Sequence, residues 1–156
     1  HGSSAASDVY KRQAPGGWSH YLVNRYPRAE IFAIDILEME EVEGVKFIQE
    51  DLRNIDQIDQ LSGFKNKFNL VISDLAPNLS GISSVDNENI LELNFLTLDG
   101  ALSFLDSDGI FIVKTFQNSN LKKFRKEMEK NFKIVQTAKP AASKKQSKEI
   151  YLYGIK

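Results

Sequence analysis

Three side chains that could do chemistry lie where short apolar runs begin or end. The run from Leu70 to Ser73 is continuous and partly β-branched, which predicts a buried strand of a parallel sheet, and Asp74 follows it directly. A second run of this kind ends at Lys114, and Glu149 opens a third. In open α/β sheets, ligands bind at the carboxyl edge of the strands. We therefore expect an acid, an amine and a second acid to meet at one such edge.

The first two of these residues also have ordinary structural explanations. Aspartate often stabilises the turn after a strand, and Pro77 lies shortly beyond Asp74. A lysine at a strand end often carries its amine out to solvent along its aliphatic stem. The strand patterns alone leave these alternatives open, so the rest of the chain has to decide between them.

A glycine-rich turn near the start of the chain is typical of a nucleotide-like cofactor site. Residues 14–19 have the sequence APGGWS. Paired glycines let the backbone approach a ligand closely, and such a turn at the start of a helix suits a nucleotide, although APGGWS could also be a simple turn. The helix that follows is expected to bury four apolar positions: Trp18, Tyr21, Leu22 and Tyr26.

Two further acids lie near the ends of strand-like runs. Asp35 belongs to the run over residues 30–36, where a carboxylate can accept hydrogen bonds from ribose hydroxyls. Asp51 ends the run over residues 45–51. Because aspartate is also a preferred helix N-cap, the structural interpretation of Asp51 stays open.

The remaining pattern alternates between strands and helices. Strands are expected at 30–36, 45–51, 70–73, 110–114, 132–137 and 149–154, helices at 54–61, 86–105 and 118–131, and a turn at Asp108–Gly109. The apolar positions expected to face the core are Ile90, Leu93, Leu96, Leu98, Ala101, Leu102 and Leu105 in the second helix, and Leu121, Phe124 and Met128 in the third. This order predicts an α/β sandwich with a mostly parallel sheet, whose last two strands form an antiparallel hairpin at its edge.

Composition excludes several kinds of chemistry. The 156 residues hold no cysteine and two histidines, which argues against thiolate chemistry, histidine metal centres and Ser-His triads. With a net charge of −1, any nucleic-acid site must come from local clusters of lysine. We find neither a signal peptide nor an apolar run long enough to span a bilayer, so we expect a cytoplasmic protein.

Six segments, in this order, resemble the FtsJ family of ribosomal-RNA 2′-O-methyltransferases. They are APGGWS, IFAIDILEM, FIQEDLR, VISDLAPNLSG, FIVKTFQ and SKEIYL. DLAPNLSG together with the later VK and KEIY is the specific part of the match, which extends over nearly all of residues 14–154. The resemblance implies a class I, S-adenosylmethionine-dependent methyltransferase with a Rossmann-like fold. It further implies a monomer without a metal that methylates a ribose in RNA of the large ribosomal subunit.

The resemblance also implies roles for individual residues. Asp74, Lys114 and Glu149 match the last three members of the family's Lys-Asp-Lys-Glu tetrad. Lys114 would accept the proton of the ribose hydroxyl, or stabilise the oxyanion when charged, while Asp74 would orient the amine and the methyl donor. Glu149 would hold the lysine geometry or contact the ribose. The S-adenosylmethionine site would be lined by Gly16, Trp18, Asp35, Asp51 and Asp74.

Lysines near the end of the chain are candidates for RNA phosphate contacts. They are Lys139, Lys144, Lys145 and Lys148, with Lys122, Lys123 and Arg125 as secondary candidates. Two alternatives to this function remain: another RNA or cap 2′-O-methyltransferase, or a Rossmann-like module that only binds. Amino-methylating enzymes usually carry an Asn/Asp-Pro-Pro-aromatic motif, which differs from the Asp74-to-Pro77 sequence DLAP.

Residues 1–13 differ from the rest of the chain. The run from Ser3 to Gln13 resembles a translated transposase-based sequencing adaptor, so we expect a non-native leader over 1–13 and one methyltransferase domain over 14–156. The family's first strand and first tetrad lysine have no counterpart after Ala14, and Lys11 lies in the leader. We therefore expect an N-terminally truncated methyltransferase that lacks its first strand and whose own activity is an open question.

Overall fold

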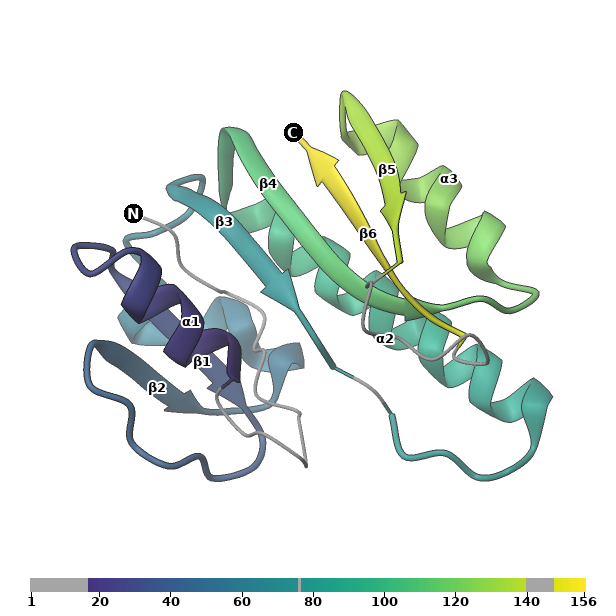
Figure 1. Cartoon of the computed structure of the whole chain (residues 1–156), viewed down its shortest axis with the longest axis horizontal. Helices are drawn as coiled ribbons and strands as arrows, with labels where there is room; N and C mark the ends of the chain where they lie inside the picture. Colours follow the sequence, from purple (N-terminus) through teal and green to yellow (C-terminus); the bar gives the residue numbers. More distant parts are fainter. Residues whose placement is uncertain (1–16, 76, 140–147) are drawn as a thin grey trace.

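The computed structural model describes residues 17–75, 77–139 and 148–156. Their alternating helices and strands confirm the α/β class (Figure 1). In chain order the elements are α1 (Gly17–Arg25), β1 (Ile31–Asp35), β2 (Val45–Gln49), the 3₁₀ helices η1 (Leu52–Gln57) and η2 (Asp59–Leu61), β3 (Phe68–Ser73), α2 (Ser83–Phe104), β4 (Leu105–Phe116), α3 (Leu121–Asn131), β5 (Ile134–Ala138) and β6 (Glu149–Ile155).

The strands form two sheets where the sequence predicted one. β1 and β2 pair in parallel, and the second sheet has the order β3-β4-β6-β5, in which β3 and β4 are parallel and β6 is antiparallel to both of its neighbours. Within the described residues, β1 and β3 are not paired with each other. The antiparallel hairpin is confirmed. Of the two hairpin strands, however, only β5 lies at the edge of the sheet, because β6 lies between β4 and β5 (Figure 1).

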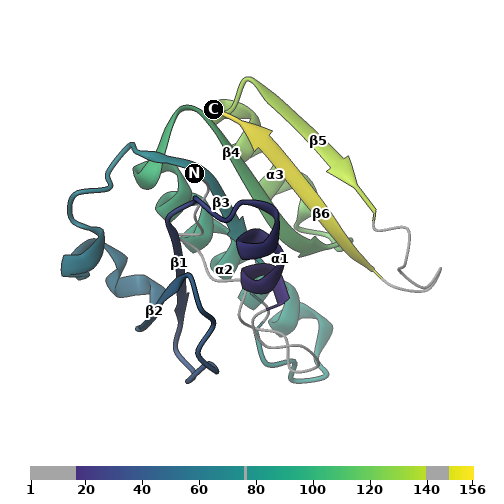
Figure 2. The same cartoon turned by 60° about the vertical axis from the view of Figure 1, so that its left-hand side comes forward.

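The helices cover opposite faces of the sheets. Figures 1 and 2 show α1 on one face and α2 and α3 on the other. Along β3, Ile72 packs with Leu22 of α1, whereas the preceding residue, Val71, belongs to the main core with residues of α2 and α3. Successive strand residues therefore point to alternate faces, which also determines where the polar residues at the strand ends point.

The α1 helix buries fewer residues than its pattern predicted. Leu22 is buried and Trp18 is half-buried, but Tyr21 and Tyr26 are 55% and 41% exposed. Both tyrosines were expected in the core, and both expectations are wrong. The helix contacts the sheet along the narrow stripe that contains Leu22, Tyr21 points to the solvent side, and Tyr26 follows the last helical residue.

The long helix α2 has a polar centre that the apolar pattern could not reveal. Ile90, Leu98, Ala101 and the following Leu105 are buried as expected, but the predicted positions Leu93, Leu96 and Leu102 are only partly buried. Leu91, Asn94, Thr97 and Phe104 are buried instead. Asn94 Nδ2 donates to Thr115 Oγ1 of β4 at 2.6 Å, and Thr97 Oγ1 donates to Asn94 O at 2.9 Å, so these polar side chains are satisfied in the core. On α3, Phe124 and Met128 are buried as predicted, and Leu121 is partly buried against the core.

Two other boundaries differ from the prediction. The helix expected over 54–61 is a pair of 3₁₀ helices that begins at Leu52, because Asp51 caps it. The turn expected at Asp108–Gly109 lies inside β4, beside a register shift opposite Phe68 to Leu70. A Cβ at Gly109 would lie 2.7 Å from the Leu105 side chain, so the close approach there requires glycine.

Candidate active site

A buried ion pair lies at the carboxyl edge of β3 and β4. Lys114 Nζ is 3.2 Å from Asp74 Oδ1. Asp74 is fully buried and Lys114 is 8% exposed. The structure therefore contradicts the ordinary explanation of the lysine, which does not extend to solvent, and places the buried aspartate in direct contact with it. Two charges are costly to bury unless their geometry and remaining hydrogen bonds compensate, which makes a functional role for this pair the favoured interpretation.

Strand alternation explains why the pair faces α1 and not the core. Lys114 is two residues beyond Ile112, which packs on the α1 side, and Asp74 is two residues beyond Ile72, which does the same. The parallel register of β3 and β4 pairs Ser73 with Val113 and thus brings the next residues side by side. A hydrogen bond from Asn94 holds Thr115, the neighbour of Lys114, on the opposite face.

Tyr151 is a site residue that the sequence analysis missed. It lies opposite Lys114 in the β4–β6 register, and its hydroxyl donates to Asp74 Oδ1 at 3.3 Å. Burial raises the pKa of the Tyr151 hydroxyl, and the nearby negative charges of Asp74 and Glu149 raise it further, so the phenol stays protonated as a donor. The alternating sequence EIYLYG contains the signal that could have identified it, because residues 149 and 151 of one strand face the same side.

Glu149 lies at the start of β6, opposite Phe116 at the end of β4. It is half-buried, and its charge contributes to the raised pKa of Tyr151. The three residues expected to meet are thus neighbours on one edge, with Asp74 and Lys114 in direct contact and Glu149 next to them through Tyr151. Their catalytic roles stay predictions.

Asp35 offers an unsatisfied acceptor where a cofactor ribose was expected. It ends β1 and is 4% exposed. Its Oδ1 accepts a hydrogen bond from Leu37 N at 2.9 Å, whereas Oδ2 is buried without a hydrogen-bond partner. Burial raises the pKa of this carboxyl, and the backbone hydrogen bonds from Leu37 and Ile36 only partly offset the effect. A buried acceptor without a donor fits the hydroxyl groups of a ribose, so this observation supports a nucleoside-containing cofactor here.

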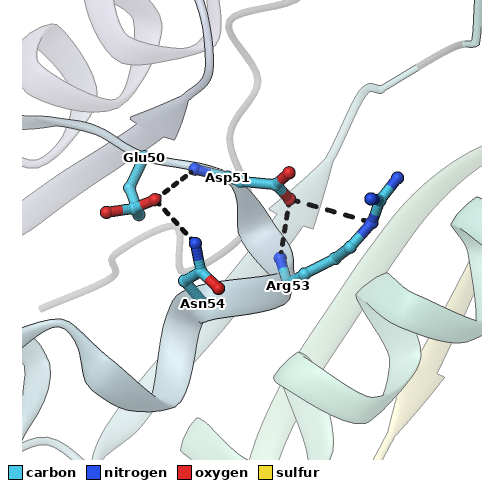
Figure 3. Close-up of polar contacts among 4 residues, drawn as sticks. All are labelled: Glu50, Asp51, Arg53 and Asn54. Atoms are coloured by element: carbon cyan, nitrogen blue, oxygen red, sulfur yellow. Dashed lines mark hydrogen bonds and ion pairs between the residues drawn. The ribbon is translucent and has the colours of Figure 1, made fainter.

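Asp51 has a clear structural role at the start of η1. It is the N-cap of η1, and its Oδ1 accepts a hydrogen bond from Arg53 N at 2.9 Å and lies 4.0 Å from Arg53 Nε (Figure 3). Glu50 Oε1 in turn accepts from Asp51 N and from Asn54 Nδ2 (Figure 3). One oxygen of Asp51 is thus committed to the helix start, and its contact with a cofactor stays a prediction.

The other predicted site residues are placed as follows. Trp18, in the first turn of α1, contacts Tyr151 edge-on with a ring separation of 6.5 Å, so it lies beside the ion pair. Gly16, Lys144 and Lys145 lie outside the described residues. Lys139 and Lys148 are exposed where β5 ends and β6 begins.

The secondary RNA candidates on α3 differ from one another. Lys122 and Lys123 are exposed. Arg125 donates to Thr137 Oγ1 at 2.6 Å and to Val135 O at 3.0 Å, which ties its guanidinium to β5.

Two properties of the described residues bear on the kind of site. They contain no group of three or more His, Cys, Asp or Glu side chains arranged to hold a metal ion. No helix among them is both long and apolar enough to cross a membrane.

Comparison with known proteins identifies relatives of the whole domain. A family model described as FtsJ-like methyltransferase matches residues 13–156. Proteins named ribosomal RNA large subunit methyltransferase E from Dechloromonas aromatica and Neisseria meningitidis serogroup C are each 42% identical to this chain, over 143 and 144 residues, which is 90% of this chain and 70% of each relative.

Solved structures show the same fold. A candidate ribosomal RNA methyltransferase from Plasmodium falciparum superimposes with a TM-score of 0.80 at 23% identity, covering 99% of this chain and 86% of that one. Human methyltransferase-like protein 13, solved with S-adenosylhomocysteine, gives a TM-score of 0.61 at 14% identity, with 89% and 66% coverage. At these identities the likeness establishes the class I methyltransferase fold and no finer property.

Proposed function

Because this chain belongs to the FtsJ-like methyltransferase family, we propose that it methylates a ribose 2′-hydroxyl in RNA of the large ribosomal subunit, with S-adenosylmethionine as methyl donor. The names of its relatives support an rRNA substrate. The observation that carries the proposal is the buried Lys114–Asp74 pair at the carboxyl edge, with Tyr151 on the same carboxylate oxygen.

The cofactor would be held by residues next to this pair. Asp35 Oδ2 would accept from the ribose hydroxyls, Trp18 would line the site from α1, and Gly16 and Asp51 would complete it. When bound, S-adenosylmethionine supplies an electrophilic methyl group on a sulfonium sulfur, so the protein has to provide an aligned and deprotonated nucleophile. No metal is needed for this transfer.

The residues at the edge are suited to prepare that nucleophile. Lys114 would take the hydroxyl proton when its amine is neutral, or stabilise the developing oxyanion when it is charged. Asp74 Oδ1 contacts Lys114 Nζ and also accepts a hydrogen bond from the Tyr151 hydroxyl, so the tyrosine would help to hold the carboxylate that positions the amine. Glu149, at the same edge, would contact the ribose or limit the movement of the lysine. Lys139, Lys144, Lys145 and Lys148 would bind phosphates of the RNA.

The test is methyl transfer from labelled S-adenosylmethionine to large ribosomal subunits that lack the modification. Because this chain covers 70% of the length of each of the two relatives, the assay uses the full-length gene product, and cofactor binding is also measured on the 156-residue chain. Lys114→Ala should lower turnover by about 10²- to 10⁴-fold, the usual contribution of a general base, while calorimetry shows retained cofactor binding. Lys67→Ala, an exposed lysine at the amino end of β3, is the matched control.

The modified RNA is then digested to nucleosides and analysed by mass spectrometry. A methyl group on the ribose supports the proposal, and a methyl group on a base rejects 2′-O chemistry. Equal turnover by Lys114→Ala and the parent would remove Lys114 from the reaction. Transfer to capped messenger RNA but not to ribosomal subunits would instead support the alternative substrate.

A further inference from the structure

A row of three aromatic rings leads from the solvent-exposed side of α1 to the buried ion pair. Tyr21 contacts Trp18 edge-on at a ring separation of 6.1 Å, and Trp18 contacts Tyr151 edge-on at 6.5 Å. Tyr151 in turn donates its hydroxyl to Asp74. Tyr21 is 55% exposed, so the outer end of the row is open to solvent while its inner end touches the candidate catalytic residues.

The surface around Tyr21 is positively charged. His20, Asn24, Arg25 and Arg28 are exposed on or just after α1, and the Arg25 guanidinium lies 5.5 Å from the centre of the Tyr26 ring. The sequence has no Asp or Glu between Asp8 and Glu30, although the chain as a whole carries a net charge of −1. Exposed aromatic rings beside arginines complement the bases and phosphates of unpaired RNA.

We propose that this exposed face of α1 binds an unpaired nucleotide within about four nucleotides of the one that is methylated. The Tyr21 ring would stack on its base, and Arg25 and Arg28 would contact the flanking phosphates. The inference deepens the proposed function and rests on it. It adds a second RNA contact surface, separate from the lysines near β5 and β6.

Distance supports a nucleotide close to the target. The path from the Tyr21 ring through Trp18 to the Tyr151 ring is no longer than about four stacked bases at ~3.4 Å per base. Tyrosine and arginine are also common in protein interfaces, so their presence alone does not select RNA. Continuity with the candidate catalytic edge and the exposed arginines of this segment favour RNA. RNA binding that no Tyr21 variant changes would leave a protein partner as the occupant of this face.

The experiment measures binding of a fluorescein-labelled oligouridine of about 12 nucleotides to the 156-residue chain by anisotropy, over a series of salt concentrations. The variants are Tyr21→Phe, Tyr21→Leu and Tyr21→Ala, and the double variant Arg25→Gln/Arg28→Gln. Lys67→Gln, which removes one positive charge from an exposed position at the amino end of β3, is the control for charge loss away from α1. Thermal unfolding and calorimetry with S-adenosylmethionine verify that each variant folds and binds the cofactor.

Stacking predicts a specific order of affinities. Tyr21→Ala and Tyr21→Leu should bind RNA roughly 5- to 150-fold more weakly, whereas Tyr21→Phe, which keeps the ring, should stay within about twofold of the parent. The arginine double variant should reduce the slope of log affinity against log salt by about 0.7 for each lost phosphate contact, and Lys67→Gln should leave the slope unchanged.

Other results overturn the inference. If Tyr21→Leu binds the oligouridine like the parent while Tyr21→Ala does not, Tyr21 makes an apolar contact and does not stack on a base, and the inference is rejected. If all Tyr21 variants bind RNA and methylate ribosomal subunits like the parent, the α1 surface is rejected while the proposed function stands. If the parent neither binds RNA nor methylates it, both are rejected.

Discussion

Removing the positive member of the buried pair, by Lys114→Met, should destabilise the fold as well as stop the reaction. The substitution keeps a similar chain length and leaves Asp74 fully buried with Tyr151 as a donor. At 3.2 Å, an effective dielectric constant of about 20 gives an attraction of ~5 kcal/mol, most of which compensates for taking the two charges out of water.

The cost of breaking the pair is therefore larger than its net contribution. Leaving one buried charge without its partner typically costs about 3–5 kcal/mol, which corresponds to a fall of roughly 6–20 °C in the melting temperature of a domain of this size. Removing both charges, with Asp74→Asn/Lys114→Met, should restore much of the lost stability, because no uncompensated charge then remains.

A surface pair of equal length provides the control. Lys130 Nζ is also 3.2 Å from its partner, Glu127 Oε2, but both side chains are solvent-exposed. Lys130→Met should cost about 0.5 kcal/mol or less, since exposed pairs within a helix contribute little. The comparison isolates burial, because the distance between the charged atoms is the same in both pairs.

The assay is urea unfolding of the 156-residue chain, followed by circular dichroism. It compares the parent with Lys114→Met, Asp74→Asn, the double variant and Lys130→Met. The reasoning predicts that each single variant is less stable than the double variant. It is refuted if Lys114→Met costs no more than Lys130→Met, or if the double variant loses as much stability as the two single variants added together.

Two further predictions concern Asp35 and Lys156. Burial raises the pKa of Asp35 in the folded state, so the stability of the parent falls as the pH rises from the ordinary value of 3.8 through that raised value. Without cofactor, Asp35→Asn should therefore melt at least as high as the parent at pH 7 and lose this advantage below pH 3.8. In calorimetry, Asp35→Asn should bind S-adenosylmethionine roughly 10- to 150-fold more weakly than the parent. Lys156 Nζ donates to Leu102 O at 2.9 Å and to Leu105 O at 3.0 Å at the end of α2. Lys156→Met should therefore lower the free energy of unfolding in urea by about 1–2 kcal/mol, and the exposed control Lys133→Met should lower it by less. Equal urea midpoints for the two variants would contradict this role of Lys156.

The sequence predicted the strand ends well because strand patterns are local. The run before Asp74 and the run that ends at Lys114 each carry a continuous apolar signal, and the structure places both residues at one edge. The position of β6 could not be read in the same way. Its insertion between β4 and β5 is a long-range pairing, and the alternation of EIYLYG fits an edge strand and an inner strand equally well.

The failures on the helices have a common physical cause. Tyr21 fits the apolar period of α1 but lies on its solvent side, while Asn94 and Thr97 break the period of α2 and yet are buried. Residue type predicts that a polar side chain stays exposed only when it has no hydrogen-bond partner in the core. Asn94 has such a partner in Thr115 of β4, and this hydrogen bond offsets the cost of burying the amide. The sequence pattern of α2 alone cannot reveal a partner on another element.

The candidate active site depends on the core behind it through strand alternation. Val113 packs into the main core with α2 and α3, Lys114 faces Asp74 on the α1 side, and Thr115 returns to the core side to accept from Asn94. A slip of β4 by one residue would turn all three side chains to the wrong face. The apolar contacts of Val113 and the hydrogen bond at Thr115 both oppose that slip, one on each side of Lys114. The position of the Lys114 amine is thus fixed by residues on the opposite face of the sheet, which is the arrangement expected where a site residue is held on a rigid element.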